Sequence, residues 1–178
     1  MKDGCLIWVA DGSYKRKIAP CVSGVGWIVY CTKTQRETKG RFFEVSKEAH
    51  AYRAEQLGLC ALHTLIAAIS FFYEIEKWNT KVGCDNFGAI KVSKRRLRRI
   101  RPSMSCADIL RNIKKARGRM TTAPFYFHVY GHMERLLRDD QLTLEQHLNI
   151  VCDGLAKTAV EMFVRSETIN PCNQLLPA

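Results

Sequence analysis

Three strand-like segments follow one another before the first helix-like segment, and strands and helices alternate after it. The leading segments are residues 5–10, 22–32 and 40–45, each rich in β-branched or aromatic residues and separated by polar connections. Consecutive strands with short connections pair antiparallel, whereas strands separated by helices pair in parallel. The order therefore predicts an α/β fold. Its mixed five-stranded sheet is a three-stranded antiparallel meander plus two parallel strands, flanked by helices.

Apolar residues at helical spacing and capping residues identify the helices. The longest helix is predicted to begin at Ser46, a good N-cap, and to end near Tyr73, and Gly58 is expected to let it approach the sheet closely. The other predicted elements are a strand at 81–85, helices at 86–93 and 106–117 (capped by Ser105), a strand at 124–130, a polar loop at 133–148 and a helix at 148–163. We assign residues 1–165 to a single domain and 166–178 to a C-terminal tail or linker.

The composition is that of an ordinary globular domain. The chain has 178 residues, of which 47% are hydrophobic and 25% charged, and this suffices for one domain with a real core. No apolar run reaches the roughly 20 residues that span a bilayer. The N-terminus does not resemble a secretory signal. We therefore expect an intracellular protein that is not secreted and has no membrane partner.

Eight cysteines are scattered along the chain without any Cys-x-x-Cys pair, which argues against a zinc ribbon. Cys5, Cys60 and Cys84 lie in apolar runs, where a free thiol behaves as a small hydrophobe. Without an export signal we expect reduced thiols. A disulfide framework is the alternative.

The positive charge of the chain is concentrated in one block. The net charge is +11, and residues 81–119 hold 13 Lys and Arg against Asp85 and Asp108, while the rest of the chain has 15 basic and 15 acidic residues. A basic block inside a balanced domain is typical of a surface that binds nucleic acid. The alternatives are a solvated helix face and, for the run at 94–101, a nuclear-import signal.

Four carboxylates are expected to converge. Asp11 follows the apolar run at 6–10, and Asp85 ends the strand at 81–85, so parallel pairing of these strands brings both to one sheet edge. Glu55 lies among packing positions of the first long helix and needs a partner, for which a divalent cation is suitable. Asp153 is placed in the first turn of the last helix. Each has an ordinary explanation alone, as a turn residue, a surface acid or a charge near a helix N-terminus.

Five short motifs in this order resemble the ribonuclease H family over nearly the whole chain. They are ADGS at 10–13 with the following GVGWIVY strand, YRAEQLGL at 52–59, CDNFGAI at 84–90, HVYGH at 128–132 and LNIVCDGLAKTA at 148–159. The resemblance looks closest to the RNase H domains of reverse transcriptases from transposable elements, especially in the run LTLEQHLNIVCDGLAK. It implies the RNase H-like fold and hydrolysis of the RNA strand of RNA–DNA hybrids.

The resemblance also implies roles for individual residues. The metal-binding and catalytic carboxylates would be Asp11, Glu55, Asp85 and Asp153, and the catalytic histidine on the loop after the fifth strand would be His132, which without the motif reads as a surface histidine. Carboxylate ligands without a Cys or multi-His cluster suit two Mg²⁺ ions, with Mn²⁺ as a substitute.

By the same resemblance the substrate contacts lie on residues before and within the basic block. They would be Gly12, Ser13, Arg53 and Asn86, with Lys94, Arg95, Arg96, Arg98 and Arg99 holding phosphates of the DNA strand. The loop after His132 looks longer than in simple bacterial enzymes and carries Asp139 and Asp140.

Two other functional classes remain open. One is a DNA nuclease or strand-transfer enzyme on the same fold, such as an integrase or resolvase; the Gly-His pair and the Asn-x-x-x-Asp motif argue against it. The other is a non-catalytic nucleic-acid-binding module, against which the intact carboxylates argue. The start at a strand and the Pro-containing tail favour a domain excised from a polyprotein, with the polymerase portion as a partner.

Overall fold

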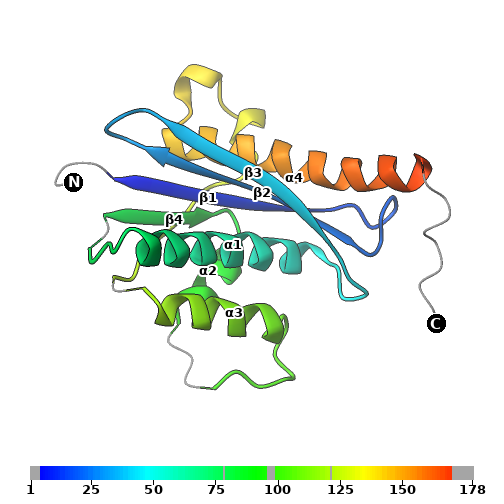
Figure 1. The fold of residues 1–178 in the computed structure, drawn as a ribbon. Helices are drawn as coiled ribbons and strands as arrows, with labels where there is room; N and C mark the ends of the chain where they lie inside the picture. Colours follow the sequence, from blue (N-terminus) through cyan, green and yellow to red (C-terminus); the bar gives the residue numbers. More distant parts are fainter. Residues whose placement is uncertain (1–4, 78, 96–98, 121, 170–178) are drawn as a thin grey trace.

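The computed structural model describes residues 5–77, 79–95, 99–120 and 122–169 (Figure 1). Its five strands are β1 (Leu6–Tyr14), β2 (Val22–Cys31), β3 (Glu37–Val45), β4 (Thr80–Cys84) and β5 (Phe125–His128). They form one sheet in the order β3-β2-β1-β4-β5. β1, β2 and β3 pair antiparallel, and β4 pairs in parallel with both β1 and β5. The predicted mixed five-stranded sheet is therefore confirmed.

Helices cover both faces of the sheet. The helices are α1 (Ala51–Phe72), α2 (Phe87–Lys94), α3 (Ala107–Gly118) and α4 (Leu144–Ile169). In Figure 1, α4 lies on one face and α1 on the other, with α3 packed outside α1. Alternating residues of β1 pack into two cores, one on each face of the sheet. Trp8 packs into the core with α1 and α3, whereas Ile7 and Val9 pack with Leu148 and Cys152 of α4.

β1 is longer than predicted, and this changes the setting of Asp11. The strand continues to Tyr14 because β2 pairs with it along its whole length, with Asp11 opposite Gly26. β4 pairs only with residues Leu6 to Val9. Asp11 therefore lies inside a strand that is paired on one side only, and not at a strand tip as predicted.

Two predicted helix starts, those of α1 and α4, and one predicted helix cap, that of α3, are wrong. His50 caps α1, since its Nδ1 accepts a hydrogen bond from the Arg53 amide, while Ser46 caps only a short turn before it. α3 is preceded by Cys106 in a left-handed conformation, without a side-chain cap from Ser105.

α4 begins at Leu144, within the predicted loop. Thr143 and Gln146 form reciprocal side-chain hydrogen bonds with each other's backbone amides, which is a capping box. Asp153 consequently lies in the third turn of α4 and not in its first. The rest of the predicted loop contains two short 3₁₀ helices, η1 (Met133–Arg135) and η2 (Asp139–Gln141). The proposed domain limit at 165 stays a prediction, and residues 170–178 of the tail lie outside the described residues.

α1 is long and apolar enough to cross a membrane by length and composition. Half of the apolar part of α1 is buried inside the fold, and the buried side chains of the helix include Gln56 and His63. His63 is held between the Leu59 carbonyl oxygen and the Tyr126 hydroxyl. These contacts are those of a core helix in a folded domain.

Candidate active site

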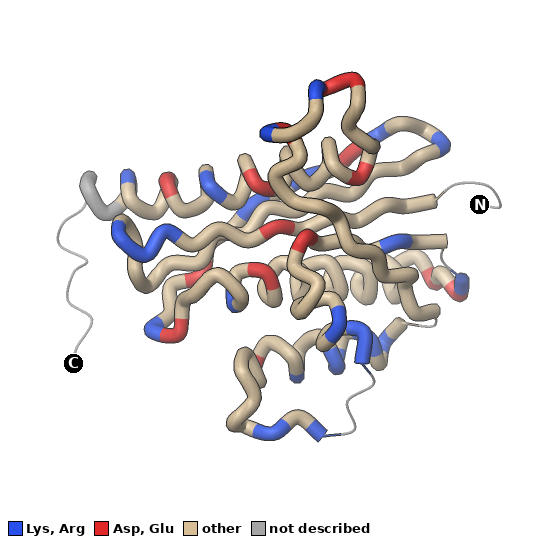
Figure 2. The backbone as a smooth tube through the Cα atoms, turned by 180° about the vertical axis from the view of Figure 1, so that it is seen from behind, with Lys and Arg blue, Asp and Glu red and all other residues tan. Residues whose placement is uncertain are grey.

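The four predicted carboxylates come from four elements and meet in the middle of the fold. Asp11 is carried by β1, Asp85 directly follows β4, Glu55 lies in the second turn of α1, and Asp153 lies on α4. Figure 2 shows acidic positions of several elements gathered there. Asp11 is only 4% exposed and Glu55 only 9%. The predicted convergence therefore places carboxylates from both helical layers around one strand.

Glycines let the two helices come close enough to β1. A Cβ at Gly12 would lie 2.6 Å from the Ala54 carbonyl carbon and from the Glu55 amide, so its absence brings α1 against β1. Gly26, opposite Asp11, has the Cys152 carbonyl oxygen where its Cβ would be. Because Cys152 precedes Asp153, this contact places Asp153 beside Asp11.

The environment disfavours ionisation of Asp11, Glu55 and Asp85. The pKa of Asp11 is raised to about 7. Burial is the largest cause, and repulsion from Asp85 and Asp153 adds to it. Burial and the charges of Asp11 and Asp85 raise the pKa of Glu55 well above its ordinary value. Burial also raises the pKa of Asp85, against the opposing influence of His132 and His128. The pKa shifts show that the side chains interact electrostatically as one cluster.

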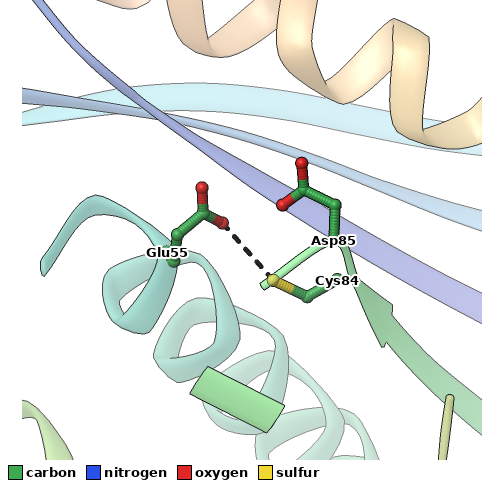
Figure 3. A group of neighbouring side chains, drawn as sticks. All are labelled: Glu55, Cys84 and Asp85. Carbon is green, nitrogen blue, oxygen red and sulfur yellow. Dashed lines mark hydrogen bonds between the residues drawn. The ribbon is translucent and has the colours of Figure 1, made fainter. Parts of the chain in front are cut away.

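Cys84 is a member of the cluster that the sequence did not reveal. Its Sγ donates a hydrogen bond to Glu55 Oε2 over 3.3 Å, as Figure 3 shows. One ligand atom each of Glu55, Cys84 and Asp85 lie within 4.8 Å of one another. The apolar run at 81–84 predicts Cys84 only as a core residue, and it is indeed fully buried. No sequence signal distinguishes a core thiol from one that contacts a carboxylate.

A divalent cation fits this donor set. Within the described ranges, Asp11, Glu55 and Asp85 form no ion pair with Lys or Arg, although all three are crowded and two are buried. Buried carboxylates without a cationic partner are destabilised, and oxygen ligands suit Mg²⁺ or Mn²⁺. Asp153 is the exception, since Lys157 pairs with it from the next turn of α4.

His132 lies next to the cluster. It adopts a left-handed conformation (φ 55°) just after Gly131, where a Cβ would collide with Asp85 Oδ2. Its side chain is 49% exposed and lies 3.7 Å from Glu134. The imidazole is close enough to lower the pKa of Asp85, so the His132 side chain lies near the cluster.

Arg53 does not face an open surface. Its side chain is 5% exposed and donates to both carboxylate oxygens of Glu44 and of Asp108, with Glu48 at 3.5 Å. This network ties α1 to β3 and α3. A role of Arg53 in substrate binding stays a prediction, and the geometry favours a structural role.

The other predicted substrate contacts differ in exposure. Ser13 is buried in β1, and the Gly12 amide donates to Asp11 Oδ1. Asn86 caps α2 through the Ala89 amide. Lys94, Arg95 and Arg99 are exposed, whereas Arg96 and Arg98 lie outside the described residues.

Comparison with known proteins supports the fold. No family model matches the chain, and no curated protein matches it in sequence. Among solved structures, RNase H1 from Halobacterium salinarum is 16% identical with a TM-score of 0.57, covering 89% of this chain and 98% of that one. The PFV RNase H domain is 12% identical with a TM-score of 0.59, covering 89% and 94%.

A third similar structure is larger. The foamy viral protease-reverse transcriptase in complex with RNA/DNA hybrid is 9% identical with a TM-score of 0.60, and the match covers 89% of this chain and 20% of that one. Together these similarities confirm the predicted RNase H-like fold, with cellular ribonucleases H and reverse-transcriptase RNase H domains among the similar structures.

Proposed function

We propose that the chain is a metal-dependent endonuclease that hydrolyses the RNA strand of RNA–DNA hybrids and leaves 5′-phosphates. The observation that carries the proposal is the convergence of Asp11, Glu55, Asp85 and Asp153 around β1, with His132 beside Asp85. The similar structures include ribonucleases H, and the structures of LC11-RNase H1 and of the foamy viral protease-reverse transcriptase are complexes with RNA/DNA hybrid. At 9–16% identity these similarities establish the fold, so the activity rests on the residues.

Each residue contributes in a distinct way. The four carboxylates would hold two Mg²⁺ ions, with Mn²⁺ as a substitute, and such ions supply charge stabilisation and an activated water in phosphodiester hydrolysis. Asp11, carried by β1 between the two helical layers, would hold these ions together with the other carboxylates. His132, on an exposed turn, exchanges a proton with the water or the leaving oxygen. The exposed cations Lys94, Arg95 and Arg99 bind phosphates of the DNA strand.

The biological context is part of the same proposal. We place the domain in a retroelement reverse transcriptase, with the polymerase portion as its covalent partner. The support is the similarity to a foamy viral protease-reverse transcriptase, of which a comparable domain forms a fifth. An intracellular location belongs to this context, and the seven cysteines in the described ranges are free thiols.

The activity is tested with end-labelled RNA–DNA hybrid, double-stranded RNA and double-stranded DNA, each with Mg²⁺ or EDTA. The expected result is metal-dependent cutting of the RNA in the hybrid alone. Asp85→Asn should abolish cutting and retain hybrid binding. Glu161→Gln is the matched control, because Glu161 lies on α4 like Asp153 but pairs with Lys15 at the surface. A wild-type protein that binds hybrid without cutting it would refute the proposed activity, and cutting of DNA would favour the strand-transfer class.

A further inference from the structure

Three exposed aromatic rings stand in a row beside the carboxylate cluster. The Phe87 and His128 ring centroids are 5.9 Å apart and their planes meet at 87°, and His128 and Tyr130 are 5.2 Å apart at 79°. Phe87 is 62% exposed and Tyr130 68%. Large aromatic surface left in water is unfavourable unless something covers it.

The row is fixed relative to the active site. His128 Nε2 donates a hydrogen bond to the Asp85 carbonyl oxygen over 2.7 Å, so the central ring is tied to the backbone of a cluster residue. Phe87 is the first residue of α2, two positions after Asp85, and Tyr130 precedes the Gly131-His132 turn. The three aromatic residues therefore lie on the chain segments that carry Asp85 and His132.

A cationic hollow adjoins the row. It encloses about 430 Å³ and is lined by Phe87, Ile90, Lys91, Lys94, Arg95, Tyr126 and His128. Lys91, Lys94 and Arg95 are exposed, and the described residues that line the hollow include no carboxylate. Figure 2 shows basic positions gathered at this edge of the molecule. We call Phe87, His128, Tyr130 and these three cations the aromatic cleft.

We propose that the aromatic cleft binds unpaired nucleotides of a single-stranded nucleic acid, with bases stacked on Phe87 and Tyr130 and phosphates held by Lys91, Lys94 and Arg95. Aromatic faces interleaved with cations are the combination that binds single strands without reading their sequence. Charge complementarity favours a polyanion over an apolar protein segment, because the described residues that line the hollow include three cations and no carboxylate. The hollow has the size of a site for a small organic group such as a nucleotide.

The cleft extends the proposed substrate. If the chain acts on hybrids, a blunt hybrid contacts the carboxylate cluster and the cations Lys94 and Arg95. A hybrid with a single-stranded extension adds unpaired bases that can stack on Phe87 and Tyr130. The consequence for hybrids rests on the proposed function. The binding of single strands does not.

The test measures binding of fluorescent 12-nucleotide oligo-dT, oligo-U and an abasic 12-mer by anisotropy in EDTA, so that no cleavage is needed. Phe87→Ala and Tyr130→Ala should each weaken binding of an oligonucleotide with bases by at least about fivefold. They should leave binding of the abasic strand unchanged. The control is Phe72→Ala, since Phe72 is 76% exposed at the far end of α1.

The outcomes separate this inference from the proposed function. An equal loss of oligonucleotide binding in Phe72→Ala overturns the proposed role of the cleft, even if hybrids are cut. Unchanged oligonucleotide binding in Phe87→Ala and Tyr130→Ala overturns it as well. Weaker binding of the strands with bases, together with unchanged binding of the abasic strand, supports the proposed role of the cleft even if the wild type cuts no hybrid. If the two variants bind only oligo-dT more weakly, the cleft binds DNA. If they bind only oligo-U more weakly, it binds RNA. Circular dichroism of each variant confirms that it is folded.

Discussion

The Cys84 thiol donates a hydrogen bond to the Glu55 carboxylate, with 3.3 Å between Sγ and Oε2. Sulfur in a set of oxygen ligands gives the site affinity for thiophilic metals. We predict that Cd²⁺ inhibits hybrid cleavage at fixed Mg²⁺, and that Cys84→Ser requires about tenfold more Cd²⁺ for the same inhibition, within the range of effects for groups that support metal ligands. The measurement is a Cd²⁺ titration of the initial rate.

Cys60→Ser is the control for this effect. Cys60 is a partly buried thiol that lies on α1 outside the cluster. Its removal should leave the Cd²⁺ titration as in the wild type. Identical titrations for Cys84→Ser and the wild type would show that the thiol does not reach the metal.

Asp11 makes the metal-free protein less stable as the pH rises. Its pKa lies near 7 in the fold and near 3.8 otherwise, so the folded state binds more protons between these values. This contribution to stability is fully present below about pH 4 and is lost as the pH rises through 7. Asp11→Asn should therefore be more stable than the wild type at pH 8 in EDTA, by an amount on the order of 2 kcal/mol.

Urea unfolding at pH 5 and pH 8 measures this difference. The two proteins should differ less at pH 5 than at pH 8. Asp139→Asn serves as the control, because the Asp139 side chain is 93% exposed. Addition of Mg²⁺ at pH 8 should raise the melting temperature of the wild type and not that of Asp11→Asn. Equal unfolding curves at both pH values would contradict the assignment.

Gly26 sets the distance between α4 and the sheet. Gly26→Ala would push a methyl group into the Cys152 carbonyl oxygen and to within 2.7 Å of the Leu155 Cβ. We expect a loss of about 1–3 kcal/mol of stability from overpacking, together with a loss of cleavage, because Asp153 moves with α4.

The matched control is Gly154→Ala. Gly154 lies next to Asp153, but a Cβ there meets nothing within 4 Å. Alanine should stabilise the helix by up to about 1 kcal/mol and leave cleavage unchanged. Thermal melts measure the stability of both variants, and initial rates of hybrid cleavage measure their activity. Tolerance of Gly26→Ala would mean that the close approach of α4 is not required.

Arg53 offers a test of binding against structure. Arg53→Lys loses the paired hydrogen bonds to Glu44 and Asp108, and we predict a loss of about 1–3 kcal/mol of stability with unchanged hybrid affinity of the folded protein. Chemical unfolding gives the first quantity and anisotropy with labelled hybrid in EDTA gives the second. Weakened hybrid binding with unchanged stability would restore Arg53 as a substrate contact.

The sequence predicts the sheet and the convergence of the four carboxylates, because the order of strands and helices follows from local patterns. Their role in metal binding stays a prediction. The sequence misplaces Asp11 relative to the strand end, since the continued pairing of residues 11–14 depends on β2. It starts α4 too late because the apolar pattern becomes clear only at Leu148, although the capping box Thr143–Gln146 could have revealed the true start.

Contacts between distant parts of the chain do not follow from local sequence patterns. Arg53 looks like an exposed cation in the sequence, and its burial depends on Glu44 and Asp108, which only the fold brings together. Cys84 looks like a core residue, which is correct for its burial but does not show its bond to Glu55. Aromatic residues 87, 128 and 130 form a row only because α2 and β5 are neighbours.

The distribution of the carboxylates over both faces of the sheet has a mechanical consequence. Glu55 comes from the α1 layer and Asp153 from the α4 layer, with Asp11 on the strand between them. Any cation shared by these side chains acts as a crosslink through the thickness of the domain. Losing the cation then loosens the attachment of whole layers, so resistance to proteases should report on the occupancy of the site.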